Sequence, residues 1–339
     1  MSASVPDIFR EGKRSRMRKI GILGMGQWAK NIVGNVQGRT DKACISAAWS
    51  RSLTKVSDFC AQNDITLREN IEDVLSDEGV DGVIVSGPAQ LHSEVAKMAL
   101  KAGKHTMVIK PIALNHADAA EMKDLASARG IVLALGFDRC FLPTADLLRK
   151  RVADGELGKI IHAEGNFCVP RFFDLTEGDW KAGNQFNPPG SLADHMLYTM
   201  IELIGPVAAL SVKSRTNAAP VNIADTVSVG LEFSSGATGT LTAIGVTQAF
   251  ERLHIFGTKG WAEIRGRTRF EFNPVDGEAV VEKLATGSLL LRQVEAFADA
   301  IEGGMSFPVS LDLAVNSAAC FEAMHLANKS GTWERVKNG

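Results

Sequence analysis

A glycine-rich turn between a short apolar run and a helix-like segment constrains this chain more than any other feature. Residues 19–31 read KIGILGMGQWAKN, so a buried-strand pattern leads directly into the pattern G-x-G-x-x-A. In such a strand–turn–helix unit, Gly24 permits the tight turn, Gly26 lets a pyrophosphate approach the backbone, and Ala29 keeps helix and strand close. The diphosphate would accept hydrogen bonds from free N–H groups at the helix N-terminus. The cofactor contacts predicted from this motif are Gly24, Gly26, Gln27, Trp28 and Ala29.

The pattern of the first 137 residues predicts an α/β domain. From Lys19 to about Phe137, short apolar runs alternate with amphipathic segments of helical length. This alternation is typical of a doubly wound parallel sheet. In the second half, the segment 226–233 alternates apolar with polar or small residues, which predicts a strand with one buried face. A chain of 339 residues is long enough for two such domains.

The end of the second predicted strand indicates which dinucleotide is bound. This strand, residues 44–49, runs into Ser50-Arg51-Ser52 about twenty residues after the glycine motif. An acidic residue at that corner would bind the ribose 2′-hydroxyl of NAD, whereas an arginine accommodates the additional phosphate of NADP. No carboxylate stands there, so Ser50 and Arg51 predict NADP(H) in preference to NAD(H). A solvated arginine in an ordinary turn is the alternative reading.

Two further strand ends carry candidate site residues. The predicted strand 82–86 ends at Ser86 and continues into Gly87-Pro88-Ala89-Gln90-Leu91-His92. Ligands of dinucleotide-binding folds lie at the carboxyl ends of parallel strands, so we expect Ser86 and Pro88 near the cofactor. His92 would either bind the cofactor or cap the following helix.

The next predicted strand, residues 106–109, ends in Lys110-Pro111. Desolvation at the mouth of a buried strand would lower the pKa of Lys110 and prepare it to polarise a carbonyl or donate a proton. A solvated loop lysine is the alternative.

Composition excludes several classes of partner. A net charge of −2 gives no basic footprint for nucleic acid at the level of the whole chain. The five cysteines are scattered and form no C-x-x-C pair, which predicts a reduced, cytoplasmic protein without structural zinc. No metal-ligand spacing is present elsewhere, and no apolar run of about 18 residues predicts a membrane span.

Taken together, the motifs resemble those of the Gfo/Idh/MocA family, named after glucose–fructose oxidoreductase, inositol dehydrogenase and a rhizopine catabolism protein. The resemblance extends over nearly all of the chain from Met17 onward. Its landmarks are GMGQWA (24–29), PAQLH (88–92), AGKH (102–105), KP (110–111), GFDRCF (136–141), GELGKI (155–160), GSLADH (190–195) and FGTKGWAEI (256–264).

The resemblance implies an N-terminal Rossmann domain and a C-terminal α/β domain with a large, mostly antiparallel sheet. We expect a flexible arm at residues 1–16, the NAD(P)-binding domain at 17–137, a substrate and oligomerisation domain at 138–310, and a helix and tail at 311–339 that return to the Rossmann domain. A sheet face left open by the helices would be buried in a homodimer or homotetramer.

The chain departs from the family pattern at two motifs. The usual Glu-Lys-Pro reads Ile-Lys-Pro at residues 109–111, so the lysine remains without the glutamate. In the motif Asp-x-Gly-x-His-x-x-Asp, Asp194 keeps its place, but Tyr198 stands where the family has its proton-transferring histidine and Ile201 replaces the second aspartate.

Tyr198, the only tyrosine of the chain, is therefore a candidate for proton transfer. It is four residues from Asp194, so both lie on one face of a helix, and a cation such as Lys110 could lower its pKa. An ordinary packed tyrosine is the alternative. His195 is the competing acid–base group, unless it is a structural histidine bonded to the backbone.

The stretch before this helix offers groups for a substrate. Arg171 and Lys181 could bind a carboxylate, and Asn184 or Asn187 could bind hydroxyls. The predicted substrate-binding residues are Arg171, Trp180, Lys181 and Asn184, although such residues are also common in surface loops.

The sequence thus predicts an NADP-dependent oxidoreductase that transfers a hydride between the nicotinamide and a carbinol carbon of a sugar, cyclitol, sugar acid or related hydroxy compound. Lys110 would polarise the oxygen, Tyr198 would move the proton, and Asp194 would hold the lysine or the substrate hydroxyl. The alternative is a nucleotide-binding sensor or partner subunit that lost catalysis together with the glutamate and histidine.

Arg51 generates a prediction about cofactor choice. NADPH should bind at least about tenfold more tightly than NADH, because one charge-assisted contact to the 2′-phosphate can supply the required ~1.4 kcal/mol. Fluorescence titration with both dinucleotides measures this ratio. Equal affinities, or an Arg51→Ala protein with an unchanged preference, would contradict the assignment.

Overall fold

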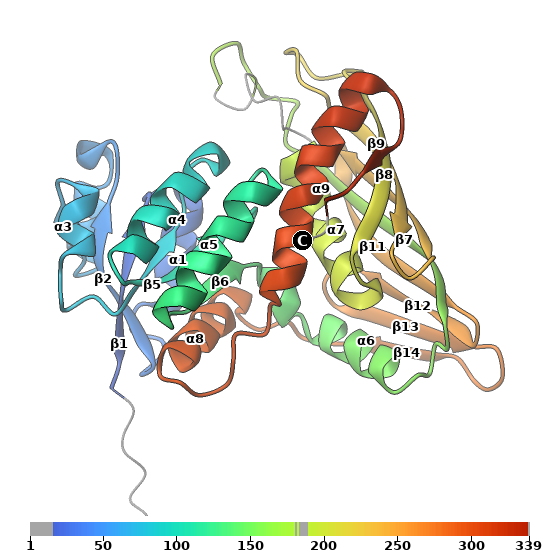
Figure 1. The fold of residues 1–339 in the computed structure, drawn as a ribbon, viewed down its shortest axis with the longest axis horizontal. Coiled ribbons are helices and arrows are strands. Elements are labelled where there is room, and N and C mark those ends of the chain that lie inside the picture. Colours follow the sequence, from blue (N-terminus) through green and yellow to red (C-terminus); the bar gives the residue numbers. More distant parts are fainter. Residues whose placement is uncertain (1–15, 180–181, 183–188, 338–339) are drawn as a thin grey trace, which may run out of the picture.

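A six-stranded parallel sheet forms the N-terminal domain, which confirms the predicted doubly wound fold. The computed structural model describes residues 16–179, 182 and 189–337 (Figure 1). The strand order is β3-β2-β1-β4-β5-β6, so the chain reverses direction across the sheet between β1 and β4. The strands are β1 (Arg18–Leu23), β2 (Ala43–Trp49), β3 (Thr66–Arg68), β4 (Gly82–Val85), β5 (His105–Ile109) and β6 (Leu133–Gly136).

Helices cover both faces of this sheet because its strands are apolar on both sides. All four residues of β4 and of β6 are buried, as continuous apolar strands of a parallel sheet require. The main helices are α1 (Gln27–Val36), α2 (Ser57–Gln62), α3 (Ile71–Leu75), α4 (His92–Lys101) and α5 (His116–Arg129). Three short 3₁₀ turns, η1 (Leu53–Lys55), η2 (Ala89–Leu91) and η3 (Asp138–Phe141), stand in the connections.

A nine-stranded sheet forms the second domain, which confirms the large, mostly antiparallel sheet that the family resemblance implies. Its order is β14-β13-β12-β11-β7-β10-β9-β8-β15, and only the β7–β10 pair is parallel among its described pairs. The strands are β7 (Ile160–Pro170), β8 (Val207–Arg215), β9 (Thr226–Phe233), β10 (Thr238–Ile244), β11 (Val246–Gly257), β12 (Gly260–Arg265), β13 (Arg269–Pro274), β14 (Val280–Lys283) and β15 (Glu334–Arg335).

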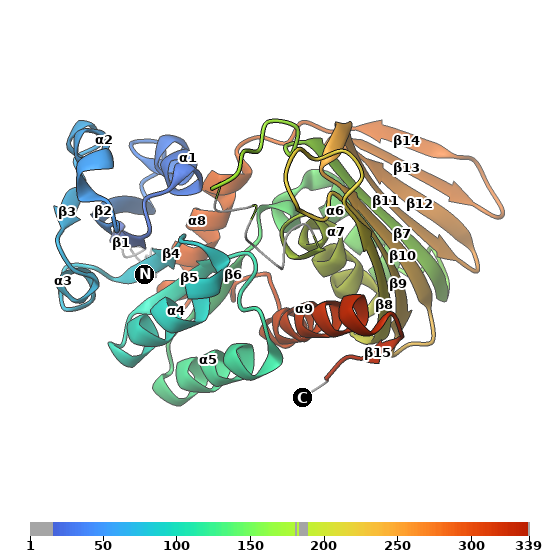
Figure 2. The ribbon, with the colours of Figure 1, turned by 90° about the horizontal axis from the view of Figure 1, so that it is seen from above.

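Helices α6 (Pro143–Ala153), α7 (Pro189–Ile204) and α9 (Leu311–Ser330) lie on one side of this sheet (Figure 2). The close fit of α7 follows from two strand glycines. A Cβ on Gly165 of β7 would lie 3.0 Å from the Met196 Cβ, and one on Gly239 of β10 would lie 3.1 Å from the Met200 Cε. The small residues let the helix backbone approach the strands. This close packing fixes the position of α7, which carries Asp194, the residue whose charge acts on Lys110 of the Rossmann domain.

Helix α8 (Leu289–Ile301) packs beside α1 of the Rossmann domain (Figures 1 and 2). Val294, Phe297 and Ala298 are buried in one cluster with apolar residues of the Rossmann domain. At the rim, the Lys42 Nζ lies 2.8 Å from a carboxylate oxygen of Asp299.

Helix α9 lies between the two domains (Figure 2). Its Asn316 accepts the Val207 N–H of β8 at 3.0 Å, whereas Glu322 accepts the His116 N–H of α5 at 3.4 Å. Since most of its residues are buried, α9 fixes the position of the second sheet relative to the first.

Candidate active site

The glycine turn after β1 lies at the point where the strand order reverses. The Gly24 N–H donates to the Trp49 carbonyl at 2.9 Å, which ties the turn to the end of β2. Gly24 has φ +104°, and a Cβ there would lie 2.8 Å from the Gly87 nitrogen, so only glycine fits. Ala29 is fully buried on the strand side of α1.

Gly26 differs from Gly24, because a Cβ on it would meet no described atom within 4 Å. Its φ of −80° is open to any residue. In the described part of the chain, no side chain caps the first turn of α1, whose N–H groups therefore face this open space. A diphosphate fits these features, since Gly26 leaves room for it and the helix N-terminus supplies donors.

The remaining predicted cofactor residues follow the carboxyl ends of β2 and β4 or lie on the first turn of α1. Ser50 and the exposed Arg51 follow β2 directly, and the buried Ser86 follows β4 with its N–H bonded to the Leu23 carbonyl at 2.9 Å. Pro88 precedes the short turn η2, while Gln27 and Trp28 are exposed on the first turn of α1. Their positions match a dinucleotide site in this fold.

His92 neither faces solvent nor caps a helix by its side chain. Its Nδ1 lies 2.7 Å from the Pro111 carbonyl oxygen and its Nε2 lies 2.9 Å from the Gly87 carbonyl oxygen. Burial lowers the pKa of His92. The ring therefore joins the loop after β4 to the loop after β5. It holds these two loops in place without facing the cofactor or solvent itself.

Lys110 is the centre of the candidate site. It follows β5, with a cis peptide bond to Pro111. Burial lowers the pKa of its amine, as the sequence predicts, while the charge of Asp194 acts in the opposite direction. Burial also raises the pKa of Asp194 to about 6, against the attraction of Lys110 and a hydrogen bond from Ser317 of α9. The pKa values of the two groups are thus shifted toward each other, as is common for paired groups at functional sites.

His195 lies on the same turn of α7 and faces the second sheet. Its ring stacks on Phe167 of β7 with centroids 4.3 Å apart. Its Nδ1 accepts a hydrogen bond from the Nε–H of Arg139 at 3.2 Å. Burial, followed by the charges of Lys110 and Arg139, holds the pKa of His195 well below its usual value. It contacts another side chain, not a backbone carbonyl as the structural alternative supposes.

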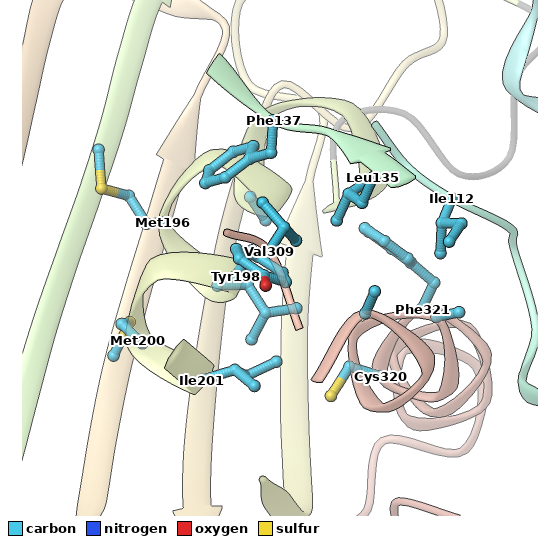
Figure 3. Close-up of a cluster of buried hydrophobic side chains, with 14 of the residues drawn as sticks. Ile112, Leu135, Phe137, Met196, Tyr198, Met200, Ile201, Val309, Cys320 and Phe321 are labelled. Carbon is cyan, nitrogen blue, oxygen red and sulfur yellow. The ribbon is translucent and has the colours of Figure 1, made fainter. Parts of the chain in front are cut away.

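Tyr198 lies in the hydrophobic core between α7, α9 and the end of β6 (Figure 3). Its side chain is fully buried, and its ring meets Phe137 edge to face with centroids 5.1 Å apart. Burial raises the pKa of its phenol most, and the neighbouring Cys140 and Glu202 raise it further. The expectation that Lys110 lowers the pKa of Tyr198 is wrong, because the phenol points into the core (Figure 3). Asp194, one turn earlier, is the residue of this pair whose charge acts on the lysine.

The predicted substrate residues are only partly described. Arg171 is exposed after β7, and its charge acts on Lys110 and His195, so it lies beside the site. Trp180, Lys181, Asn184 and Asn187 lie outside the described residues.

Sequence reasoning missed four charged residues and one serine that surround this site. Ser317 belongs to α9, and the mostly apolar sequence of this helix gives no sign that one of its serines contacts the site. Arg139 belongs to the GFDRCF motif but received no role, although a buried Asp-Arg pair within an apolar run is itself a signal. The residues added by the structure are Asp138, Arg139, Glu251, Arg267 and Ser317.

Among residues 16–179, 182 and 189–337, no group of three histidine, cysteine or carboxylate side chains could hold a metal ion. Over the same ranges, no helix is long and apolar enough to cross a membrane.

Comparisons with known families agree with this architecture. Residues 18–137 match the model of an oxidoreductase family with an NAD-binding Rossmann fold, GFO/IDH/MocA, and residues 146–263 match the model of the GFO/IDH/MocA C-terminal domain. Trans-1,2-dihydrobenzene-1,2-diol dehydrogenase of Macaca fascicularis is 27% identical over 258 residues, which span 72% of this chain and 73% of that protein. With three other curated relatives, the match spans only 52%, 62% and 44% of their own length.

Solved structures share the whole fold. Levoglucosan dehydrogenase in complex with NADH and levoglucosan superposes with a TM-score of 0.84 at 18% identity, over 95% of this chain and 100% of that one. The WlbA dehydrogenase from Bordetella pertussis, in complex with NADH and UDP-GlcNAcA, gives 0.84 at 19% identity, over 95% and 98%. At identities of 18% and 19%, these two comparisons show that the fold is shared and nothing more.

The two turn glycines give a matched pair of variants. Gly26→Ala should fold like the wild type, because its Cβ enters open space, but should weaken dinucleotide binding by at least about tenfold, since that space would receive the diphosphate. Gly24→Ala should lower the free energy of unfolding by about 1–3 kcal/mol through backbone strain and contact with Gly87. Thermal unfolding and fluorescence titration separate the two effects. A Gly26→Ala protein with unchanged cofactor affinity would argue against this crevice as the diphosphate site.

Proposed function

Because the chain belongs to the Gfo/Idh/MocA family of NAD-binding oxidoreductases, we propose that it is an NADP-dependent enzyme that interconverts a carbinol and a carbonyl group of a sugar, cyclitol, sugar acid or related hydroxy compound. The substrate class is supported by the ligands bound in two structural neighbours, levoglucosan and UDP-GlcNAcA, and by a relative that is a dihydrodiol dehydrogenase. The choice of NADP rests on Arg51 after β2. The observation that carries the activity is the electrostatic coupling of the half-buried Lys110, at the carboxyl end of β5, with the buried Asp194.

When bound, the nicotinamide supplies or accepts the hydride. Lys110 binds the reacting oxygen and moves its proton, since burial lowers the pKa of the amine and so makes the proton easier to give up. Asp194 keeps the lysine in place and shifts its proton affinity, and Ser317 holds the Asp194 carboxylate. Arg171 at the rim would bind an acidic or hydroxyl group of the substrate.

A spectrophotometric screen tests the activity directly. Sugars, sugar acids and dicarbonyl compounds are offered with both cofactors, and dinucleotide absorbance is followed. Turnover with at least one class supports the proposal. Tight NADPH binding without turnover across the panel would favour the sensor alternative.

Lys110 and Tyr198 give the sharpest mutational contrast. Lys110→Met should reduce kcat by roughly 10²- to 10⁴-fold, because the positioned proton-transfer group is lost while the side-chain volume is kept. Tyr198→Phe should keep kcat within a few-fold of the wild type, since its hydroxyl faces the core. Steady-state kinetics, together with NADPH titration as the control for folding, measure both. The opposite ranking would restore Tyr198 as the proton-transferring group.

We further propose that the open face of the nine-stranded sheet joins two copies of the chain. Opposite the helices, this face carries exposed threonines of β10 and a cluster of three rings. His254 stacks on Phe256 with centroids 4.0 Å apart and meets Trp261 edge to face at 4.8 Å. Flat, partly apolar sheet faces of this kind suit an isologous contact.

Thr240, exposed on β10 near the middle of the sheet, provides the test. Thr240→Arg should shift the protein from dimer or tetramer toward monomer in light scattering coupled to size exclusion, because like charges would meet across a two-fold contact. Ser127→Arg, on the exposed side of α5, is the matched control and should leave the mass unchanged. A monomeric wild type would refute this assembly.

A further inference from the structure

Arg139 and His195 form a side-chain contact that the proposed reaction has not used. The Arg139 Nε–H donates to the His195 Nδ1 at 3.2 Å in a buried setting. The contact joins η3, which follows the Rossmann sheet, to α7 of the second domain. The contact therefore holds the segment that leaves the Rossmann sheet against α7.

Arginine can only donate in such a contact, because its guanidinium stays protonated in proteins and carries no acceptor. The Nδ1 of His195 must consequently hold a lone pair. In the neutral imidazole the single proton then belongs to Nε2, which is the ring nitrogen that remains for a ligand.

Arg139 is itself held firmly in this position. Its side chain is 4% exposed, its Nη1 lies 2.8 Å from a carboxylate oxygen of Glu251, and its guanidinium lies 5.0 Å from the Phe167 ring centroid. His195 stacks on the same Phe167 ring. Although burial raises the pKa of Glu251, the hydrogen bond and charge of Arg139 hold it below its usual value, so the pair remains ionised.

The charges around the imidazole also oppose a second proton on it. Four cations face His195 from different elements: Lys110 after β5, Arg139 in η3, Arg171 after β7 and Arg267 between β12 and β13. Asp194 precedes it on α7, but its carboxylate interacts with Lys110 and Ser317, while Glu251 pairs with Arg139.

We infer that Arg139 is a positioning residue that fixes His195 as the neutral Nε2–H tautomer, so that His195 presents a hydrogen-bond donor to the reacting oxygen of the substrate. This inference rests on the proposed function for the identity of that oxygen. A neutral Nε2–H donor can stabilise developing negative charge on oxygen without accepting a proton. The proton itself is then moved by Lys110, and His195 does not act as a shuttle between acid and base forms.

The tautomer can be observed without substrate, cofactor or turnover. In protein labelled with ¹⁵N-histidine, long-range ¹H–¹⁵N correlation distinguishes a nitrogen that carries a proton from one with a lone pair. The His195 signals are assigned by their loss in His195→Gln. The wild type should show a lone pair on Nδ1 and a proton on Nε2, unchanged from about pH 8 to pH 5. A proton on Nδ1, or titration within this range, would overturn the inference.

Paired variants then test Arg139 as the cause. Arg139→Met combined with Glu251→Gln removes the donor without leaving a buried carboxylate unpaired. It should produce a mixture of tautomers and lower kcat by roughly 10²-fold, because the wrong tautomer offers a lone pair where a donor is needed. Arg267→Met, which also removes a cation near His195 but no hydrogen bond to it, is the control and should retain the wild-type tautomer.

The remaining outcomes are distinguishable from failure of the proposed function. If the double variant keeps the pure Nε2–H tautomer, or loses no more activity than Arg267→Met, Arg139 has no positioning role. If the spectra agree but no compound in the screen turns over, the tautomer assignment stands and the proposed reaction fails.

Discussion

The burial of one ammonium group beside one carboxylate determines the arrangement of this site. Moving either charge out of water costs several kcal/mol, and mutual attraction recovers that only when the two are held close. Lys110 and Asp194 come from different domains, so the pair is formed only when α7 docks against the end of β5. The opposite pKa shifts of the two groups are the direct result of this burial.

Much of the surrounding structure serves to hold that pair. His92 fixes the loops that follow β4 and β5 through two carbonyl contacts, and it thereby sets the direction in which Lys110 leaves its strand. Helix α9 bonds to β8 and α5 and brings Ser317 to the carboxylate. The distance between the domains is therefore set by packing well away from the reacting groups.

Tyr198 shows why residue rarity and spacing are weak guides to a catalytic role. The four-residue spacing predicts that it shares a helix face with Asp194, but that face meets different neighbours one turn apart. The charge of Asp194 acts on Lys110, whereas the phenol enters a cluster with Phe137, Val309 and Ile201 (Figure 3). The motif identified the correct helix, and the different neighbours of these two buried side chains separated their roles.

The sequence by itself determined the features that depend on local backbone chemistry. The glycine turn, the alternation of strands and helices, and Lys110 at a strand end are set by steric freedom and hydrophobic periodicity over a few residues, and the sequence carries them plainly. Only the tertiary structure decided that Arg139 contacts His195, that Ser317 contacts Asp194, and that Tyr198 packs in the core. These pairs are 56, 123 and 61 residues apart for Arg139–His195, Ser317–Asp194 and Tyr198–Phe137. A single sequence contains no local signal for such contacts, because they arise from how two domains and a returning helix pack.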